Sequence, residues 1–384
     1  MKKQHTKKTE IVFFVFSGLV VITGLVFYIA DARQNGTITV TNEGNTVITE
    51  KVKEDEQKIE RKIPDVVKAL YVTMYTAGNK EKIDALIALA KDTEVNAMVI
   101  DVKGSEGELV FDYFDVGALL ERLHEADIHT IARIVVFQDN SAVARSPDTV
   151  IKKAGGGVWR DRRGFAWVDP AAESGWEYVF EVSKRALAIG FDEINYDYIR
   201  FPTDGNLDAM VYPSWNEQQE PRHEVIKKFA MRAREVLKAH KPRASLSIDI
   251  FGYTFIQQHD LGIGQRLEDM IEAFDFVYPM VYPSHYSAGN FGFANPAEHP
   301  YEVVKGTLES GLSKMGESAP SSAHRIRPWL QSFNLGAIYT SDMMHAQIQG
   351  TRDGLGDPPA GGSGWLLWDP KNQYDNARVY LKKE

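Results

Sequence analysis

The sequence predicts an α/β protein whose main domain is a (β/α)8 TIM barrel. Apolar strand-like runs alternate with amphipathic helical patterns eight times in residues 63–384, which is the number of units that closes such a barrel. Connections from strand to helix are long after the third, fourth and sixth strands, whereas connections from helix to strand are short. A doubly wound sheet is the alternative, but no G-x-G-x-x-G or phosphate-binding loop follows any strand.

The elements follow from apolar periodicity and from Gly and Pro at the boundaries. We expect strands at residues 69–74, 97–103, 130–137, 190–202, 246–251, 276–282, 326–331 and 364–368. We expect helices at residues 80–91, 116–125, 175–189, 221–240, 266–273, 301–311, 341–350 and 376–383.

The N-terminal segment predicts a location outside the cytoplasm for the barrel. Residues 11–30 form an apolar run without a charge, which is long enough to cross a hydrocarbon core of roughly 30 Å. Four lysines lie in residues 1–10, so the positive-inside rule makes that segment a cytoplasmic tail. We therefore predict a single-pass membrane anchor. A cleaved signal peptide is the alternative, because Ala30-Asp31-Ala32 has the A-x-A form of a cleavage site.

Residues 31–62 are polar and charged, with too few apolar side chains for a core. We predict a stalk there, with a short hairpin around residues 37–49 and a charged helix after it. The barrel then occupies residues 63–384.

Composition excludes several classes of function. The net charge of -9, without a long basic run, argues against nucleic-acid binding. The chain has no cysteine, which excludes disulfides, thiol catalysis and cysteine-ligated metals. The histidines form no H-x-H or H-E-x-x-H pattern, and no G-x-S-x-G is present. We therefore predict neither a metal nor another cofactor, and no serine-hydrolase site.

The fourth predicted strand carries the strongest functional signal. Alternate residues of a strand share a face, so Glu193, Asn195 and Asp197 point one way while Ile194 and Tyr196 point the other. Ile and Tyr suit packing against the outer helices, which makes the polar face the inner one. Asp197 is then nearest the carboxyl-terminal mouth, where barrel active sites are built. We expect Glu193 to be a structural, hydrogen-bonded acid near the barrel floor.

The other strands also end in polar or aromatic side chains, which together would ring the mouth. These are Asp101 and Lys103, Arg133 and Asp139, Asp249, Tyr278, Tyr282 and His285, Trp329 and Gln331, and Trp368 and Asp369. Two carboxylates among aromatic rings fit glycoside hydrolysis, in which one acid protonates the leaving oxygen and the other acts as nucleophile or activates water. Aromatic faces bind sugar rings, and polar side chains bind their hydroxyls.

The fourth strand also supports a family resemblance. Gly190-Phe191-Asp192-Glu193-Ile194-Asn195-Tyr196-Asp197-Tyr198-Ile199-Arg200-Phe201-Pro202 resembles the GFDEIQFDYVRFP hallmark of a bacterial family described as glycoside hydrolases. Residues 96–103, 279–286, 327–331 and 364–368 match the same family, and the similarity spans about residues 66–374. The resemblance implies a TIM barrel related to amylase-like and other barrel glycosidases.

Amylase-type glycosidases place the nucleophilic Asp at the end of strand four and the acid at the end of strand five, where Asp197 and Asp249 lie here. The wider group usually has Glu at the second position, so other acids remain alternatives for that role: Asp101, Asp139, Asp169 and Asp369. The side chains that we expect to bind substrate or tune the acids are Asp101, Lys103, Arg133, Arg200, Tyr282, His285, Trp329, Gln331 and Trp368. For Asp197, pairing with Arg200 is the structural alternative.

These features predict a glycoside hydrolase that acts on an extracellular or cell-envelope polysaccharide or oligosaccharide. Two other functions remain possible on the same scaffold. One is a non-catalytic glycan-binding or envelope-organising protein. The other is a polysaccharide deacetylase, which would need a bound metal near His285.

Overall fold

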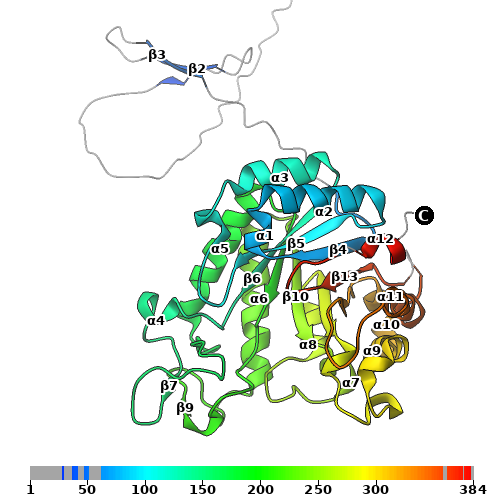
Figure 1. The fold of residues 1–384 in the computed structure, drawn as a ribbon. Helices are drawn as coiled ribbons and strands as arrows, with labels where there is room; N and C mark the ends of the chain where they lie inside the picture. Colours follow the sequence, from blue (N-terminus) through cyan, green and yellow to red (C-terminus); the bar gives the residue numbers. More distant parts are fainter. Residues whose placement is uncertain are drawn as a thin grey trace, which may run out of the picture. The chain divides into compact units, whose positions relative to one another are not determined.

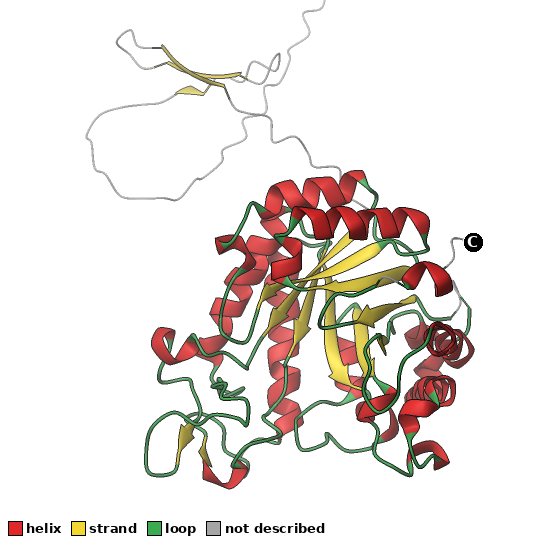
Figure 2. Ribbon diagram, in the orientation of Figure 1, coloured by secondary structure: helices red, strands yellow, loops and turns green. Residues whose placement is uncertain are grey.

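The computed structural model describes residues 62–357, 361–374 and 376–381, together with the backbone of three short strands that precede them. The chain divides into two compact units, Met1–Arg61 and Lys62–Glu384. The second unit holds a closed, all-parallel barrel of eight strands in the order β10-β11-β12-β13-β4-β5-β6-β8. Its helices surround the strands (Figures 1 and 2). The predicted (β/α)8 barrel is confirmed.

The barrel strands lie close to their predicted positions. Their bounds are β4 (Val67–Val72), β5 (Ala97–Lys103), β6 (His129–Val135), β8 (Glu193–Asp197), β10 (Ser245–Phe251), β11 (Phe276–Val281), β12 (Trp329–Gln331) and β13 (Gly364–Trp368). The fourth strand ends earlier than predicted because Tyr198 adopts a left-handed backbone with φ of 57°. That conformation is unfavourable for a residue with a side chain and cannot continue a strand.

The main outer helices are α2 (Lys80–Asp92), α3 (Val116–Glu125), α5 (Trp176–Ile189), α6 (Arg222–His240), α8 (Leu267–Ala273), α9 (Pro300–Met315), α11 (Ser341–Leu355) and α12 (Ala377–Tyr380). Short helices interrupt the connections: α1 (Met74–Ala77), α4 (Ala142–Arg145), α7 (Tyr253–Ile256) and α10 (Ala319–Ala323). Each predicted helix is present, although α11 extends to Leu355 and the described part of the last one is a single turn.

Two long loops follow β6 and β8 and pair with each other. The strands β7 (Lys152–Lys153) and β9 (Met210–Val211) join them in a small antiparallel sheet, which projects at the lower left of Figure 1. The Trp159 indole also donates to the Asn206 carbonyl, at 2.7 Å. These contacts join the two loops into an ordered wall on one side of the barrel mouth. Both loops are among the long strand-to-helix connections that the sequence predicts.

The inner and outer faces of β8 differ as predicted. Ile194 and Tyr196 are fully buried against the helical layer, and the Tyr196 hydroxyl lies 2.7 Å from Ser183 on α5. Glu193, Asn195 and Asp197 face the barrel interior, where their hydrogen-bond partners come from neighbouring strands. Polar side chains are tolerated in this interior because each of the three makes at least one hydrogen bond.

The N-terminal unit contains a three-stranded antiparallel sheet of β1 (Tyr28–Ile29), β2 (Thr37–Thr41) and β3 (Val47–Lys51). The β2–β3 pair confirms the predicted hairpin. The predicted charged helix, the basic tail and the rest of the predicted anchor of residues 11–30 lie outside the described residues. Among the described residues, no helix combines the length and apolarity needed to span a membrane.

Candidate active site

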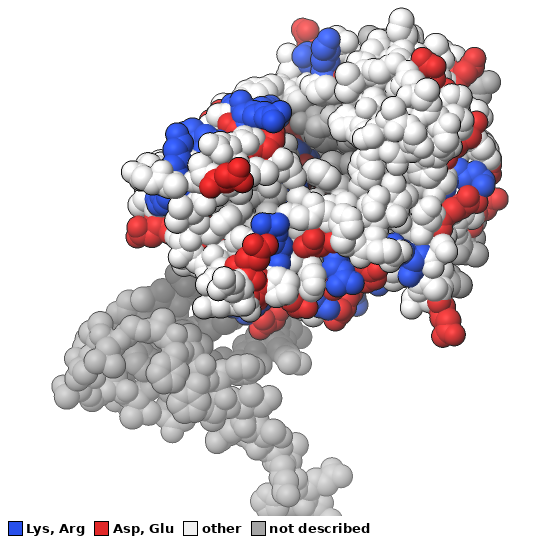
Figure 3. Space-filling view, turned by 90° about the horizontal axis from the view of Figure 1, so that it is seen from below, with Lys and Arg blue, Asp and Glu red and all other residues white. Residues whose placement is uncertain are grey.

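A cavity of about 460 Å³ opens at the carboxyl-terminal end of the barrel strands. Figure 3 views the molecule from this end and shows a hollow near the middle, with Lys and Arg side chains beside it. The lining side chains come from the strand ends and the loops after them: Arg133, Arg163, Asp197, Tyr198, Arg200, Asp249, Phe251, Tyr253, Met280, Tyr282, His285, Tyr286 and Trp368. Asp197 and five members of the predicted ring at the strand ends line this cavity: Arg133, Asp249, Tyr282, His285 and Trp368.

Arg133 is the central cation of this site. Its guanidinium donates to Asp101 Oδ1 at 2.6 Å through Nη1 and to Asp197 Oδ2 through Nη2. Its Nε lies 3.8 Å from Asp249 Oδ2 and is buried without a hydrogen-bond partner among the described residues. The Trp368 ring lies against the guanidinium, 5.0 Å from centroid to Cζ. One positive charge thus serves three carboxylates, which leaves the cluster short of positive charge.

The pKa of Asp249 departs clearly from its ordinary value. Asp249 is 1% exposed, and burial together with the nearby charge of Asp197 raises its pKa well above the ordinary value. Its Oδ1 accepts hydrogen bonds from Trp329 Nε1 at 2.8 Å and from Asn195 Nδ2 at 3.0 Å. A carboxyl group that accepts two N–H groups on one oxygen carries its proton on the other. Both donors contact Oδ1, so Oδ2 is the oxygen that remains available to carry a proton.

Asp197 lies in a different environment from Asp249. Besides the Arg133 pair, its Oδ1 accepts the backbone N–H of Tyr198 at 2.6 Å. The left-handed backbone of Tyr198 creates this contact and brings the Tyr198 ring to the cavity wall. Strained backbone of this kind concentrates at functional sites. Asp197 is thus held by a cation and by a backbone donor, both of which stabilise a carboxylate.

Aromatic rings form the remaining walls. Trp368 stacks on Tyr71 with centroids 3.8 Å apart, and Tyr253 stacks on Tyr286 at 5.0 Å. Tyr282 packs edge-on against His285 at 5.2 Å. Burial lowers the pKa of His285, which favours the neutral imidazole. These apolar faces border the carboxylates as a sugar-binding cavity requires.

Seven of the predicted site residues line the cavity: Arg133, Asp197, Arg200, Asp249, Tyr282, His285 and Trp368. Asp101 and Trp329 lie behind them and hold Arg133 and Asp249 in place. Burial raises the pKa of Asp101, against the opposing charge of Arg133. Their position makes them supports for the site.

Lys103 and Gln331 lie away from the cavity lining, which differs from the prediction. Lys103 is fully buried, and its Nζ pairs with Asp139 at 3.1 Å and donates to the Val135 carbonyl at 2.9 Å. The pairing of β5 with β6 shifts register between Asp101 and Lys103, so the alternation of faces fails there. Gln331 is buried, and its side-chain Nε2 donates to the Phe333 carbonyl at 2.9 Å and to the Leu335 carbonyl at 3.2 Å.

The other acids considered for protonating a leaving group are occupied elsewhere. Asp139 pairs with Lys103 and Arg145, whose charges lower its pKa against the effect of burial. Asp169 accepts the backbone N–H groups of residues 171, 214 and 215 and ties the two long loops together. Asp369 accepts backbone N–H groups from residues 371 and 373. None of these three lines the cavity.

The predicted structural alternative, in which Asp197 pairs with Arg200, is wrong. The cation paired with Asp197 is Arg133. The lining residues that sequence reasoning did not assign to the site are Arg163, Phe251, Tyr253, Met280, Tyr286 and Tyr198. Tyr198 was within the recognised motif, and the signal that could have found it is its position directly after Asp197. Strand alternation could have found Phe251, which is two residues after Asp249, and Met280, which is two residues before Tyr282. Arg163, Tyr253 and Tyr286 lie outside the strands and carry no periodic signal that points to the cavity.

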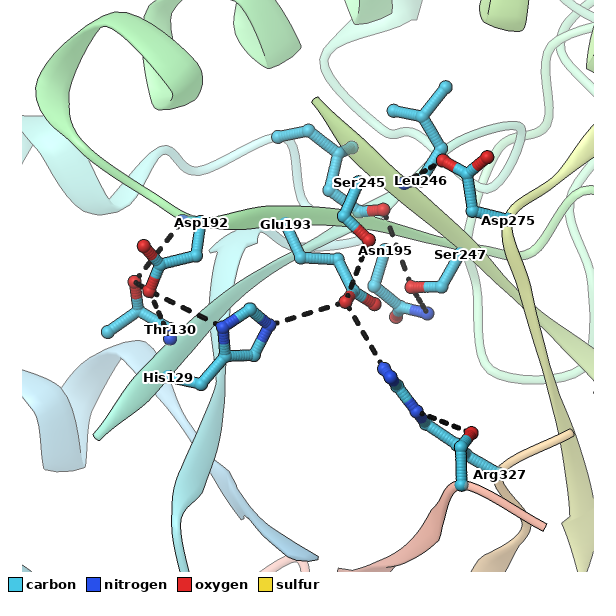
Figure 4. Close-up of polar contacts among 12 residues, drawn as sticks. His129, Thr130, Asp192, Glu193, Asn195, Ser245, Leu246, Ser247, Asp275 and Arg327 are labelled. Carbon is cyan, nitrogen blue, oxygen red and sulfur yellow. Dashed lines mark hydrogen bonds and ion pairs between the residues drawn. The ribbon is translucent and has the colours of Figure 1, made fainter. Parts of the chain in front are cut away.

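A second ionic cluster lies at the barrel floor, as Figure 4 shows. Glu193 Oε2 accepts from Ser245 at 3.1 Å, and His129 and Arg327 each lie 3.3 Å from it. Its other oxygen accepts from the Tyr278 hydroxyl. Burial alone would raise the pKa of Glu193, but His129 and Arg327 lower it to about 2. Glu193 is the structural acid that the sequence predicts.

Within the part of the chain that the structure describes, no three His, Cys, Asp or Glu side chains are arranged to hold a metal ion. His285 lies 3.1 Å from Ser284 Oγ through its Nδ1, and its other ring contacts are with Tyr282 and Phe333. The described site therefore does not offer the ligand set that a metal-dependent deacetylase would use.

The fold and the site define a parallel (β/α)8 barrel with a carboxylate–arginine cluster at its carboxyl-terminal mouth. Residues 69–374 match the profile of a protein family described as "Putative glycosyl hydrolase domain". The match covers most of the sequence, so the chain belongs to this glycosyl hydrolase family. A search of curated proteins found no match.

Several solved structures are similar. A hypothetical protein from Ruminiclostridium thermocellum is 34% identical, with 47% of this chain and 96% of that one covered and a TM-score of 0.42. An alpha-L-fucosidase isoenzyme 2 from Paenibacillus thiaminolyticus is 13% identical, over 82% of this chain and 48% of that one, with a TM-score of 0.53. An alpha-galactosidase from Lactobacillus brevis is 11% identical, over 84% and 39%, with a TM-score of 0.50. The chain spans less than half of either glycosidase, and these two similarities show the fold alone.

Proposed function

We propose that the protein is a glycoside hydrolase in which Asp249 is the general acid and Asp197 is the nucleophile or the base. The observation that supports this proposal is that two carboxyl groups beside the same guanidinium lie in different environments. Both acids are buried, but Asp197 is hydrogen-bonded to Arg133, whereas Asp249 lies 3.8 Å from the Arg133 Nε and has a raised pKa. Two carboxyl groups with opposite environments are the usual way to obtain an acid and a base from the same residue type.

In this proposal each of the two residues has a separate step. Asp249 donates the proton on Oδ2 to the glycosidic oxygen, and the bond from that oxygen to the anomeric carbon breaks. Asp197 either attacks the anomeric carbon or takes a proton from the water that attacks it. The Trp329 and Asn195 N–H groups on Oδ1 then stabilise the ionised Asp249. Both carboxyl groups contact one guanidinium, so their separation is below the roughly 9.5 Å upper limit for such pairs.

The charge of the cluster supports the same chemistry. Arg133 faces three carboxyl groups, Asp101, Asp197 and Asp249, and its single positive charge cannot balance all of them. An oxocarbenium-like transition state carries positive charge on the sugar ring. Fixed negative charge in a water-poor cavity stabilises that charge without reorganisation. Trp368, Tyr282 and Tyr286 supply apolar faces for the ring.

We further propose that the substrate is an extracellular or cell-envelope polysaccharide or oligosaccharide. Support comes from the apolar run at residues 11–30, which predicts a membrane anchor, and from the polar residues 31–62 between that run and the barrel. Membrane fractionation with N-terminal sequencing tests this location. We expect a membrane-bound protein with an intact N-terminus. A soluble protein whose chain begins at Arg33 would show that the apolar run is a cleaved signal peptide and not an anchor.

The function is tested with a panel of polysaccharides and the full-length protein, its Asp197→Asn variant and an Asp208→Asn control. Asp208 is an exposed acid in the loop after β8. We expect release of reducing sugar from at least one glycan by the wild type and the control, and none above background by Asp197→Asn. Equal cleavage by Asp197→Asn would refute the assignment of Asp197. Binding without cleavage of any glycan would favour the glycan-binding alternative.

A further inference from the structure

One wall of the cavity contains an arginine without a protein anion. Arg200 is half-buried, and its Nη1 donates to the Phe201 carbonyl at 3.1 Å and to Thr203 Oγ1 at 3.4 Å. Among the described residues, no carboxylate forms an ion pair with it. Burial lowers the pKa of Arg200, against the more distant charges of Asp197, Asp204 and Asp161.

Aromatic packing holds the Arg200 guanidinium in place. Its Cζ lies 4.8 Å from the Trp167 ring centroid, 5.0 Å from that of Tyr198 and 5.1 Å from that of Phe251. Trp167 is 1% exposed and its indole donates to Asp161, so this support is itself fixed. A guanidinium that is oriented by three rings loses little conformational freedom when it binds a ligand.

A second arginine lines the same cavity. Arg163, from the long loop after β6, is exposed, and its Cζ lies 5.2 Å from the Phe165 ring centroid. It also forms no ion pair with any residue in the described part of the chain. The neighbouring Arg162 is exposed as well but does not line the cavity. Arg163 and Arg200 thus place two positive charges without an ion-pair partner in the described residues in the cavity lining. Both act on Tyr198, since each of them lowers the pKa of its hydroxyl against the effect of burial.

The cavity is therefore polarised. Asp197 and Asp249 lie around Arg133, and Arg163 and Arg200 both lie near the Tyr198 side chain. A neutral sugar needs no such charge, since amide and hydroxyl groups suffice for its hydroxyls. A partly buried guanidinium without an anion is costly, and planar guanidinium groups match the oxygens of carboxylate, sulfate and phosphate.

From this arrangement we propose that the substrate is an acidic glycan. An anionic substituent of the sugar bound in the cavity pairs with Arg200 and Arg163, while the anomeric carbon faces Asp197 and Asp249. This inference rests on the proposed function for the identity of the ligand as a sugar. It adds the charge class of that sugar and two residues that select it.

The test is calorimetric titration of the full-length protein in the Asp249→Asn background, which is expected to prevent turnover. The probes are oligosaccharides of a uronic acid, of a sulfated sugar and of a phosphorylated sugar. Each is paired with its carboxyl-reduced, desulfated or dephosphorylated counterpart. The variants are Arg200→Gln, Arg200→Lys and Arg163→Gln, with Arg162→Gln as the matched control.

We expect one anionic class to bind at least about tenfold tighter than its neutral counterpart. Arg200→Gln should remove that preference, Arg163→Gln should reduce it, and Arg200→Lys should keep part of it because the charge remains. Arg162→Gln should leave it unchanged. Circular dichroism and the melting temperature check that each variant is folded, and a structural role alone would not alter the charge preference.

Equal binding of charged and neutral oligosaccharides, or an unchanged preference in Arg200→Gln, would overturn the inference. Cleavage of neutral glycans alone by the wild type would overturn it while the proposed function stands. Arg200-dependent binding of an acidic glycan that wild type never cleaves would support the inference and refute hydrolysis. If no oligosaccharide of either charge binds, both proposals fail.

Discussion

The floor and the mouth of the barrel each hold arginine among acids, but the two clusters are built differently. At the floor, Glu193 receives hydrogen bonds from four side chains, one of them the cation Arg327. At the mouth, Arg133 faces three carboxylates and keeps its Nε unbonded among the described residues. The first arrangement satisfies its acid and the second leaves its acids competing for one cation.

This difference appears in the pKa values. Hydrogen bonding and charge lower the pKa of Glu193 to about 2, so that it stays ionised. Burial and a neighbouring carboxylate raise the pKa of Asp249 well above the ordinary value. A carboxylate whose oxygens are fully hydrogen-bonded stabilises the fold, whereas acid catalysis needs a carboxyl group that holds its proton near neutral pH. We therefore interpret the floor cluster as structural and propose that the mouth cluster is the reactive one.

The largest expected effect separates the clusters by activity. Asp249→Asn should lower kcat by about 10²- to 10⁴-fold, because the amide cannot donate a proton to the leaving oxygen. The fold should persist, since an amide can accept the Trp329 and Asn195 hydrogen bonds on its oxygen. Steady-state kinetics on a cleaved glycan measure this. A substrate with an activated leaving group should recover much of the loss, and no recovery would argue against the acid role.

The next effect separates the clusters by stability. Glu193→Gln should lower the free energy of unfolding by about 3–5 kcal/mol, because it leaves the buried Arg327 charge without an anion. Urea denaturation measures the change. Glu121→Gln on the exposed face of α3 is the control and should stay within about 0.5 kcal/mol of wild type. A Glu193→Gln variant as stable as wild type would contradict a structural role.

Stability should also depend on pH in opposite directions at the two sites. The pKa of Asp249 is raised on folding, so its contribution is fully present below the unfolded pKa of about 3.9 and is lost as pH rises through the folded pKa. Wild type should therefore lose stability relative to Asp249→Asn as pH increases above about 4, by at most about 1.4 kcal/mol per pH unit. Urea titrations of both proteins across that range test the sign.

The pKa of Glu193 is lowered, so its contribution is present above the unfolded pKa and is lost as pH falls toward about 2. The gap between wild type and Glu193→Gln should accordingly narrow in acid. With rising pH, the stability of wild type should fall relative to Asp249→Asn and rise relative to Glu193→Gln. If both relative stabilities change in the same direction, the proposed difference between the two clusters is wrong.

The smallest effect concerns the support of Asp249. Trp329→Phe should lower kcat by about tenfold, because ionised Asp249 loses one N–H donor. The same loss raises the Asp249 pKa further, so the basic limb of the pH–rate profile should move to higher pH. Trp365→Phe is the matched control, since the Trp365 indole has no hydrogen-bond partner among the described residues. A purely structural role for Trp329 would leave the profile in place.

The sequence was sufficient for the fold and for the chemistry of the strand interiors. Eight periodic units predict the barrel, and the alternation of Glu193, Asn195 and Asp197 predicts which face is polar. Asp197, Asp249 and Arg133 converge because the ends of neighbouring parallel strands meet at one mouth.

The rest of the site could not be predicted because alternation holds only while a strand continues. The register shift after Asp101 turns Lys103 toward Asp139, and the left-handed Tyr198 redirects the chain that carries Arg200. Arg163 reaches the cavity from an irregular loop and Tyr253 from the short helix α7, and the path of both segments depends on contacts distant in sequence.

The most direct test of the account compares Asp197→Asn with Glu193→Gln on one cleaved glycan, with kcat/KM corrected for the folded fraction. The two acids lie on the same strand and the same face, so the comparison isolates their position along the barrel. We expect Asp197→Asn to lose at least about 10³-fold and Glu193→Gln to stay within a fewfold of wild type. Equal losses in both variants, or retained turnover in Asp197→Asn, would contradict a reactive mouth above a structural floor.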